Sequence, residues 1–501
     1  MDGVKSLSPE ARWKLVSNLK LGSKSKPTRR VWIPKPGTDE KRPLGIPTMY
    51  DRGVQALVKM ALEPEWEAQF EPNSYGFRPG RSCHDAIEAI FKSIKCKSKF
   101  VLDADISKCF DRINHEALLK KLNTSPTIRR QVRAWLKAGV MDGKQLFSTS
   151  EGTPQGGVIS PLLANIALHG MEERIKQYPR SLKGKKRENS VSLSLIRYAD
   201  DFVILHEDIT VVQRCREIIS EWLLDMGLEL KPSKTRLTHT LNECEGEKPG
   251  FDFLGFKVRQ FKVGRHHSAK NPHKELLGFK TIITPSKQKL KIHYERLVSI
   301  INDHKAMPQS ALIRNLNPVI TGWSNYYSAA VSKRAYSALS FTMYSKLRAW
   351  ANKRHPKKSG RWVSKKYWQS IGEKNWIFAT KGENPTILRT HDKTPIVRHV
   401  KVRSEASPYD GNLIYWSSRM GTHPEVNKKV AILLRKQKGK CTHCKLYFRE
   451  EDVLEVDHII PKKLGGKDEY KNFQILHRHC HDRKTTEDGS VGSTHDNVLN
   501  H

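Results

Sequence analysis

Residues 193–206 read Leu-Ser-Leu-Ile-Arg-Tyr-Ala-Asp-Asp-Phe-Val-Ile-Leu-His, with the adjacent acids Asp200 and Asp201 between two short apolar runs. The runs are typical of β-strands, so we expect a β-hairpin with the acidic pair at its tip. Because neighbouring carboxylates repel each other, the pair is costly unless cations lie beside it. Taken alone, an Asp-Asp pair is also a common turn former. The rest of the chain decides between these interpretations.

A third acid, Asp105, ends the short strand expected from Phe-Val-Leu-Asp-Ala-Asp-Ile at 100–106. Carboxylates gathered on adjacent strand ends are what two-metal phosphoryl transfer requires, because the two ions contact both the attacking and the leaving oxygen. The sequence therefore predicts a two-metal site built from separated segments of the chain.

The charge balance points to a polyanionic partner. The 501 residues include 89 Lys and Arg against 52 Asp and Glu, a formal net charge of +37, which favours binding through phosphate contacts. The sequence contains no apolar run near 18 residues and does not begin with a secretory signal. Eight cysteines, three of them in one C-terminal cluster, favour a metal site in a reducing compartment over a disulfide framework. We expect an intracellular, cytoplasmic nucleic-acid-binding protein of two to four domains that does not contact membranes.

The pattern along the chain changes near residue 276. Before it, short β-like runs alternate with amphipathic helices expected at 84–94 and 211–226. After it, apolar residues recur at helical spacing, which we attribute to helix packing: Leu290, Tyr294, Leu297 and Ile301, then Tyr336, Leu339, Met343, Leu347 and Trp350. Residues 381–430 are rich in Pro, Gly, Thr and basic groups, and we expect either a poorly structured connector or a small basic module there. Residues 431–490 form a separate compact unit in this scheme, and 491–501 a mobile tail.

Residues 353–367 contain seven Lys and Arg interleaved with Trp362 and Tyr367. A run of charge is usually a solvated face. Aromatic rings among the charges favour nucleic-acid contact by phosphate pairing and base stacking. The contacts predicted here are Lys353, Arg354, Lys357, Lys358, Arg361, Trp362, Lys365 and Lys366.

Eight ordered blocks extend the acidic pattern over the chain. They are Arg-Arg-Val-Trp-Ile-Pro-Lys-Pro (29–36), Arg-Pro-Leu-Gly-Ile-Pro-Thr (42–48), Asn-Ser-Tyr-Gly-Phe-Arg-Pro-Gly-Arg-Ser (73–82), Ala-Asp-Ile-Ser-Lys-Cys-Phe-Asp (104–111), Gly-Thr-Pro-Gln-Gly-Gly-Val-Ile-Ser-Pro-Leu-Leu-Ala-Asn (152–165), Tyr-Ala-Asp-Asp (198–201), Gly-Leu-Glu-Leu-Lys-Pro-Ser-Lys-Thr (227–235) and Gly-Phe-Asp-Phe-Leu-Gly-Phe (250–256). In their order and amino-acid sequence, these blocks closely resemble the reverse transcriptases encoded by group II introns.

The resemblance implies roles for individual residues. Two Mg²⁺ ions would be held by Asp105, Ile106, Asp200 and Asp201. The triphosphate of an incoming dNTP would be gripped by Arg29, Lys35 and Arg42, whose alternative is plain surface charge. Two further residues would contact the nucleotide: Phe110, which crowds a ribose 2′-hydroxyl unless it is an ordinary buried ring, and Gln155, which also contacts the template. Lys234 would either protonate the leaving pyrophosphate or contact a phosphate.

A second constellation lies near the C-terminus. Cys-Thr-His-Cys (441–444) is followed 33 residues later by another Cys/His group, a spacing typical of zinc sites. The predicted ligands of a structural Zn²⁺ are Cys441, Cys444, His477 and Cys480.

The other polar residues of this region, in Glu-Val-Asp-His-Ile-Ile-Pro (455–461) and in 472–484, resemble the HNH nuclease motif. The resemblance implies His458 as general base, because an imidazole titrates near working pH. It implies Asp457 and His481 as ligands of one Mg²⁺ or other divalent ion, and Asn472 as the residue that orients the base or the metal site. The alternative is a zinc ribbon without catalysis.

The implied fold is an α+β multidomain chain of the right-hand polymerase type. Fingers and palm with an antiparallel palm sheet would occupy 1–275, an α-helical thumb and maturase (X) domain 276–385, a basic DNA-binding connector 386–430, and a small ββα-metal HNH zinc domain 431–490. Members of the family carry an N-terminal extension before the position of Met1, so we expect that part to be absent here.

The implied function is threefold. An RNA-directed DNA polymerase would copy intron RNA from a nicked DNA primer, a maturase would bind intron RNA and assist splicing, and the HNH unit would nick target DNA. The particle would be a ribonucleoprotein with one or two protein copies. Two alternatives stand beside it: a splicing maturase with weak or lost polymerase activity, and a free-standing homing nuclease, which would leave the polymerase motifs of 1–275 unexplained.

Overall fold

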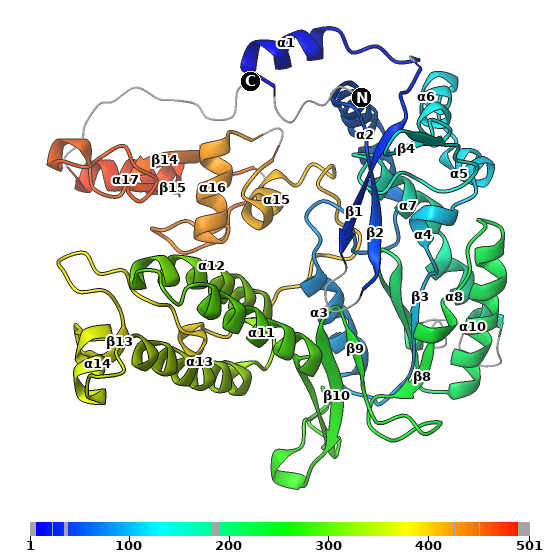
Figure 1. The fold of residues 1–501 in the computed structure, drawn as a ribbon. Helices are drawn as coiled ribbons and strands as arrows, with labels where there is room; N and C mark the ends of the chain where they lie inside the picture. Colours follow the sequence, from blue (N-terminus) through cyan, green and yellow to red (C-terminus); the bar gives the residue numbers. More distant parts are fainter. Residues whose placement is uncertain are drawn as a thin grey trace.

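The computed structural model describes residues 7–22, 24–34, 39–181, 191–423, 426–449 and 451–488. Two of the expectations above, a phosphate contact by Lys35 and a mobile tail at 491–501, fall on residues outside this description. Figure 1 shows the palm elements on one side, the helices α11 to α13 on the other, and the C-terminal unit reached through α15 and α16.

The palm is a four-stranded antiparallel sheet in the order β6-β7-β3-β8. Its strands are β6 (Ser194–Tyr198), β7 (Asp201–His206), β3 (Phe100–Asp105) and β8 (Arg236–His239). Since successive side chains point to opposite faces, Leu102 and Phe202 join one buried cluster, whereas Val101 and Val203 join another. Burial of both faces explains why the central strand β7 reads as a continuous apolar run from Phe202 to Leu205.

Helices cover both faces of the palm sheet. On the first face lie α7 (Ser160–Leu168), α8 (Met171–Ser181) and α10 (Ile209–Leu224). On the second lie α3 (Cys83–Ile94) and a three-stranded sheet of β9 (Phe251–Phe253), β10 (Phe256–Lys262) and β11 (Phe279–Pro285). In Figure 1, α8 and α10 stand on the opposite side of the palm from α3.

The fingers contain a second four-stranded sheet in the order β2-β1-β4-β5. It is built from β1 (Thr28–Pro34), β2 (Lys41–Ile46), β4 (Val140–Asp142) and β5 (Gln145–Phe147). The helices of this region are α1 (Pro9–Ser17), α2 (Met49–Gln69), α4 (Cys109–Arg112), α5 (His115–Leu122) and α6 (Pro126–Leu136). Helix α2 begins where Thr48 caps the backbone N–H of Asp51.

The predicted helical region is confirmed as three long helices, α11 (Lys287–Asp303), α12 (Gln309–Tyr327) and α13 (Lys333–Arg354). The whole second stripe, from Tyr336 to Trp350, is buried, and Leu297 and Ile301 of the first stripe are buried with it. A short helix and a hairpin follow: α14 (Gly360–Tyr367), β12 (Trp368–Ile371) and β13 (Lys374–Phe378).

The connector is more ordered than its composition indicates. Within 386–430, α15 (Leu413–Met420) buries Trp416 completely in the same cluster as Tyr75. Arg419 donates two hydrogen bonds to the buried Asp85 of α3. Of the two alternatives for this region, the poorly structured connector is therefore wrong for 397–421, whereas a small basic module agrees with the order seen there. The sequence did not decide between them, because the partners of this segment lie more than 300 positions away and leave no local periodicity.

The C-terminal unit follows α16 (Lys428–Gln437). The antiparallel strands β14 (Leu454–His458) and β15 (Phe473–His477) lead into α17 (Arg478–Glu487), a ββα arrangement. Short 3₁₀ turns at Pro232–Lys234, Arg265–His267, His391–Lys393 and Lys462–Leu464 complete the described elements. Among these elements, no helix combines the length and apolarity needed to cross a membrane.

Candidate functional site

The acidic pair lies at the tip of the β6–β7 hairpin, as predicted. Strand β6 ends at Tyr198, Ala199 takes a left-handed conformation with φ of 59°, and β7 begins at Asp201. Strand β3 runs antiparallel to β7 with Asp105 directly opposite Asp201, and the N–H of Ile106 donates to the carbonyl of Asp200 at 3.3 Å. Three acids from two separated segments thus converge at one end of the sheet. The Ile106 side chain is a buried hydrocarbon without a donor atom, so the ligand that this residue could offer is its backbone carbonyl oxygen.

The electrostatics of this cluster favour a bound cation. Burial raises the pKa of Asp200, and burial together with the charges of Asp200 and Asp105 raises the pKa of Asp201 to about 6. The ammonium of Lys234 lies 2.5 Å from Asp105 Oδ2. Burial opposes the charge of Lys234, but its hydrogen bond to Asp105 and the nearby acids raise its pKa. Carboxylates are the ligands that hard divalent cations prefer, so the donor set fits such ions.

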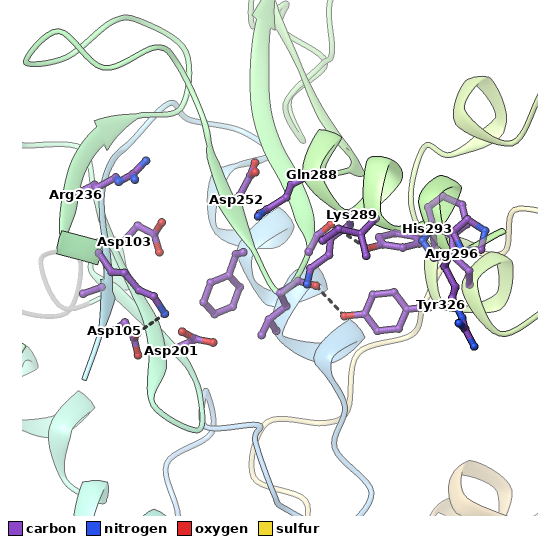
Figure 2. Close-up of a pocket in the computed structure, with 18 residues that line it drawn as sticks. Asp103, Asp105, Asp201, Arg236, Asp252, Gln288, Lys289, His293, Arg296 and Tyr326 are labelled. Atoms are coloured by element: carbon purple, nitrogen blue, oxygen red, sulfur yellow. Dashed lines mark hydrogen bonds and ion pairs between the residues drawn. The ribbon is translucent and has the colours of Figure 1, made fainter. Parts of the chain in front are cut away.

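Asp105 and Asp201 stand in the wall of a cleft of about 850 Å³ that extends from the palm to the thumb helix α11. Figure 2 shows Asp103, Asp105 and Asp201 on one side and Lys289, His293 and Arg296 on the other. Tyr326 closes the far side by donating to the carbonyl of Leu254 at 2.8 Å.

Sequence reasoning missed several residues of this cleft: Asp103, Arg236, Asp252, Lys289 and Arg296. Asp103 is two positions before Asp105, so the strand alternation could have placed it on the same face. Burial and the charge of Asp201 raise its pKa to about 7. Lys289 and Arg296 are seven positions apart, a helical spacing that places both on one face of α11.

The predicted nucleotide contacts come from the fingers. Arg29 and Arg42 are exposed on the paired strands β1 and β2. Arg29 shares a face with Ile33, whose register partner is Arg42, so both guanidinium groups project from the same face. Burial raises the pKa of Asp200, and the charge of Arg42 is one of those that oppose this rise, so Arg42 acts on the acids electrostatically.

Phe110 lies in α4, the short helix that follows β3, and Gln155 lies in the turn before α7. The Phe110 ring packs edge-on against Phe77 with centroids 5.9 Å apart. The Gln155 side chain donates to Asp111 Oδ1 at 3.0 Å, and its carbonyl accepts from Gly45 N–H at 2.6 Å. Phe110 is therefore packed against Phe77, and Gln155 is hydrogen-bonded to α4 and to β2.

The basic stretch 353–367 divides into structural and exposed parts. Arg354 donates to the carbonyls of Lys305 and Met307 at 2.6 and 2.9 Å, so it braces the α11–α12 loop. Two neighbouring lysines cover the Trp362 ring, Lys358 at 5.5 Å and Lys366 at 5.1 Å from its centroid. The remaining predicted contacts are exposed: Lys353, Lys357, Arg361 and Lys365.

The four predicted zinc ligands form one compact group. The ligand atoms of Cys441, Cys444, His477 and Cys480 all lie within 4.8 Å of one another, and within the described chain no other such group is found. His477 turns Nδ1 to Cys444 Sγ at 3.3 Å and Nε2 to Asp452 at 3.2 Å. A carboxylate behind a histidine is the usual partner of a metal-bound imidazole, so the Cys₃His set fits zinc.

The HNH residues lie beside this group. His458 ends β14, and its Nε2 lies 2.7 Å from Asp468 Oδ1. Asp457 accepts from Gln474 at 2.9 Å and lies 3.1 Å from the ammonium of Lys484 in α17. Sequence reasoning did not single out Lys484 or Asp468.

Asn472 and His481 have different surroundings. Asn472 accepts from the N–H of Ile460 at 2.9 Å and donates to the carbonyls of Ile460 and Lys467 at 3.0 and 3.1 Å, so it fixes the loop after His458. His481 is partly exposed in α17, with Nδ1 3.7 Å from Asp482. Within the described residues, no hydrogen bond joins His481 to Asp457.

Three family models match separate parts of the chain. They are "Reverse transcriptase (RNA-dependent DNA polymerase)" at residues 33–258, "Group II intron, maturase-specific domain" at 290–368 and "HNH endonuclease" at 441–487.

The chain is also similar to curated proteins. It is 28% identical over 424 residues to the group II intron-encoded protein LtrA of Lactococcus lactis subsp. cremoris, a match covering 70% of this chain and 69% of LtrA. It is 32% identical over 309 residues to protein YkfC of Escherichia coli K12, covering 54% of this chain and 78% of YkfC. It is 34% identical over 296 residues to a putative COX1/OXI3 intron 2 protein of Saccharomyces cerevisiae, covering 47% of this chain and 32% of that protein.

Proposed function

Because the chain belongs to the family of group II intron-encoded proteins, we propose that its palm carboxylates carry RNA-directed DNA synthesis and that its C-terminal unit nicks DNA. Reverse transcriptase, maturase and HNH endonuclease functions are combined in this one chain. The observation that carries the polymerase assignment is the pairing of Asp105 with Asp201, beside Asp200, in the wall of the palm cleft.

In the palm, Asp105, Asp200 and Asp201 would hold two divalent ions, which we assign as Mg²⁺. Such ions activate the primer 3′-hydroxyl and stabilise the leaving pyrophosphate. Lys234 holds a proton on Nζ beside Asp105, so it is placed to protonate the pyrophosphate or to bind its phosphate. The charge of Lys234 also offsets the repulsion among the acids.

Residues of the fingers would select and orient the dNTP. Arg29 and Arg42 share one face of the β1–β2 hairpin, and a guanidinium makes two parallel hydrogen bonds to phosphate. We assign Lys35, which lies between Arg29 and Arg42 in the sequence, the same role of binding the triphosphate. Phe110, backed by Phe77, would crowd a ribose 2′-hydroxyl, and Gln155 would contact nucleotide and template.

In the C-terminal unit, His458 would remove a proton from the attacking water. Its contact with Asp468 Oδ1 orients the imidazole. Asp457 and His481 would hold one divalent ion, which stabilises the charge that develops on the phosphodiester. Asn472 would orient the base by fixing the loop that follows it. The Cys₃His group would hold Zn²⁺ as a structural ion.

The domain limits we propose are fingers and palm to residue 275, thumb and maturase domain at 276–385, a DNA-binding connector at 386–430 and the HNH unit at 431–490. The maturase-specific domain implies binding to intron RNA, and target DNA would reach the HNH unit. A ribonucleoprotein of one or two protein copies acting in the cytoplasm completes the proposal. A maturase with weak or lost polymerase activity is the second candidate.

Primer extension separates the two candidates. The full chain is given poly(rA)–oligo(dT), dTTP and Mg²⁺, and Asp200→Asn is compared with Asp225→Asn, the same substitution at an exposed position after α10. We expect Asp200→Asn to lose at least about 100-fold in rate, because it removes one carboxylate charge from the metal-binding set, with RNA binding retained. Equal rates in wild type and Asp200→Asn would refute the polymerase assignment. RNA binding without extension by the wild type would favour the maturase alone.

A further inference from the structure

The β12–β13 hairpin presents a tryptophan in a strained conformation. Gln369 pairs with Ile377 and Ile371 with Lys374, so β13 carries one more residue than β12 between these pairs. Trp376 lies in this bulge with φ of 62° and its side chain 63% exposed. A left-handed conformation is rare for a bulky residue, and bulges often re-aim a side chain at a functional site. The strain therefore turns an aromatic ring outward instead of burying it.

Trp376 lies at the edge of a cavity of about 890 Å³ between the hairpin, α12, α13 and residues 387–395, which we call the hairpin pocket. Aromatic and aliphatic side chains line it, including Met343, Tyr344 and Trp368, and Tyr344 packs edge-on against Trp368 at 5.8 Å. The hairpin pocket shares no lining residue with the palm cleft. It is a second, independent concave site in the described chain.

The charges around the hairpin pocket favour an anion. Lys374, Arg389 and Lys393 line it. Among the described lining residues the only carboxylate is Asp392, which already accepts from Ser340 Oγ at 2.7 Å and lies 3.6 Å from Lys393. An apolar floor with a cationic rim matches a nucleobase with its attached phosphate.

Other tryptophans of this region are engaged by the protein itself. Trp362 is covered by Lys358 and Lys366, and Trp323 stacks on His293 at 4.5 Å. Within the described residues, no ring or cation contacts Trp376. Its free face distinguishes it as a stacking surface.

We propose that the hairpin pocket binds an unpaired nucleobase of RNA, stacked on Trp376, with the adjoining phosphates on Lys374 and Lys393. Unpaired bases that stack on aromatic side chains are the usual target of sequence-selective RNA recognition. The inference deepens the proposed maturase function and rests on it for the choice of RNA as the ligand. A basic surface alone would bind any polyanion, whereas this pocket distinguishes loops from paired stems.

Two RNA hairpins of equal length and charge test the proposal. One carries an eight-nucleotide single-stranded loop, and the other is paired up to a four-nucleotide loop. Binding to the full chain is followed by fluorescence anisotropy. We expect Trp376→Ala to weaken binding of the large-loop RNA at least about 5-fold, the lower end of what one stacked base contributes, and to leave the paired RNA unchanged. Trp376→Phe should keep most of the affinity. Lys374→Ala should weaken both RNAs and reduce the salt dependence by about one ion.

Trp13→Ala is the matched control, because Trp13 is a 76% exposed tryptophan on α1, outside this pocket. The rate of primer extension on poly(rA)–oligo(dT) should be the same for Trp376→Ala and wild type. A failure of the polymerase assignment would be seen separately, as a wild-type protein that binds the large-loop RNA but does not extend the primer. A loop containing 4-thiouridine should crosslink to residues 374–378. Equal affinity of Trp376→Ala and wild type for the large-loop RNA, or crosslinks only elsewhere, would overturn the proposal and leave the hairpin pocket to a protein partner.

Discussion

Replacing Arg419 by methionine tests how the connector is fixed to the palm. The Asp85 carboxylate is fully buried and accepts two hydrogen bonds from Arg419 Nη2, at 2.6 and 2.7 Å. It also accepts from the N–H of Val402 at 2.7 Å and from Ser82, and lies 3.0 Å from His399. Burial raises the pKa of Asp85, but these partners outweigh burial and hold it well below its usual range.

Methionine keeps the aliphatic stem and removes the charge, so Asp85 would stay buried with its main cationic partner gone. Removing one partner of a buried ion pair costs about 3–5 kcal/mol. For a cooperative unit of 150–250 residues, each kcal/mol lowers Tm by about 2–4 °C, so we expect a loss of at least about 6 °C. Lys97→Met is the control, because the Lys97–Glu207 pair at 2.9 Å is exposed and exposed pairs contribute at most about 1 kcal/mol.

Thermal unfolding of the full chain gives the Tm, and hydrogen exchange followed by mass spectrometry locates the change. Exchange should increase in 397–421 for Arg419→Met and stay unchanged for Lys97→Met. The double variant Asp85→Asn with Arg419→Met should be more stable than Arg419→Met alone, because it removes the unpaired charge. A Tm loss of less than about 2 °C, or a double variant no more stable than the single one, would refute this account of the docking.

Three further predictions concern the ring of Phe110, the Cys₃His group and the pair of His293 and His391. Phe110→Ala should admit ribonucleotides and reduce discrimination against them about 10-fold or more, measured by primer extension with competing rNTPs; unchanged discrimination would assign Phe110 to the core. Cys444→Ser should release zinc and abolish DNA nicking with extension retained, and nicking without bound zinc would contradict it. Burial lowers the pKa of His293 to about 3 and of His391 to about 4, with their Nε2 atoms 2.9 Å apart. Because the unfolded chain binds more protons than the folded chain in this range, the stability that the neutral pair contributes is complete above about pH 6.5 and is lost as pH falls through 4 toward 3. His293→Phe should therefore flatten the dependence of Tm on pH over that range.

Local features of the fold were predictable because local signals mark them. The helix expected at 84–94 is Cys83–Ile94, and the one expected at 211–226 is Ile209–Leu224. Ser82 and Asp208 cap these two helices, which fixes each start to within two residues. The hairpin tip at the acidic pair follows in the same way from two apolar runs and the short turn between them.

Features that depend on distant partners were not predictable from one sequence. Asp85 and Arg419 are 334 positions apart, and neither stands in a periodic pattern that would pair them. The bulge at Trp376 depends on the register of two short strands, which composition does not set. The α11 residues of the palm cleft could be predicted only from the position of the thumb relative to the palm, which the sequence does not show.

The palm site and the HNH site, the two candidate sites for catalytic metal ions, each contain a lysine, and the contacts of the two lysines differ. In each, a lysine ammonium lies at a candidate carboxylate ligand: Lys234 at Asp105, 2.5 Å away, and Lys484 at Asp457, 3.1 Å away. The Lys234 side chain is 56% exposed and Asp105 is its one ion-pair partner among the described residues, so it can move to a phosphate when cations neutralise the acid. Lys484 is 15% exposed and also bound to Asp488 and to the carbonyl of His458. If Lys484 left Asp457 for a phosphate, the contacts that hold β14 to α17 would break. We therefore propose that Lys484 stays fixed and stabilises the ββα unit, whereas Lys234 takes part in the chemistry.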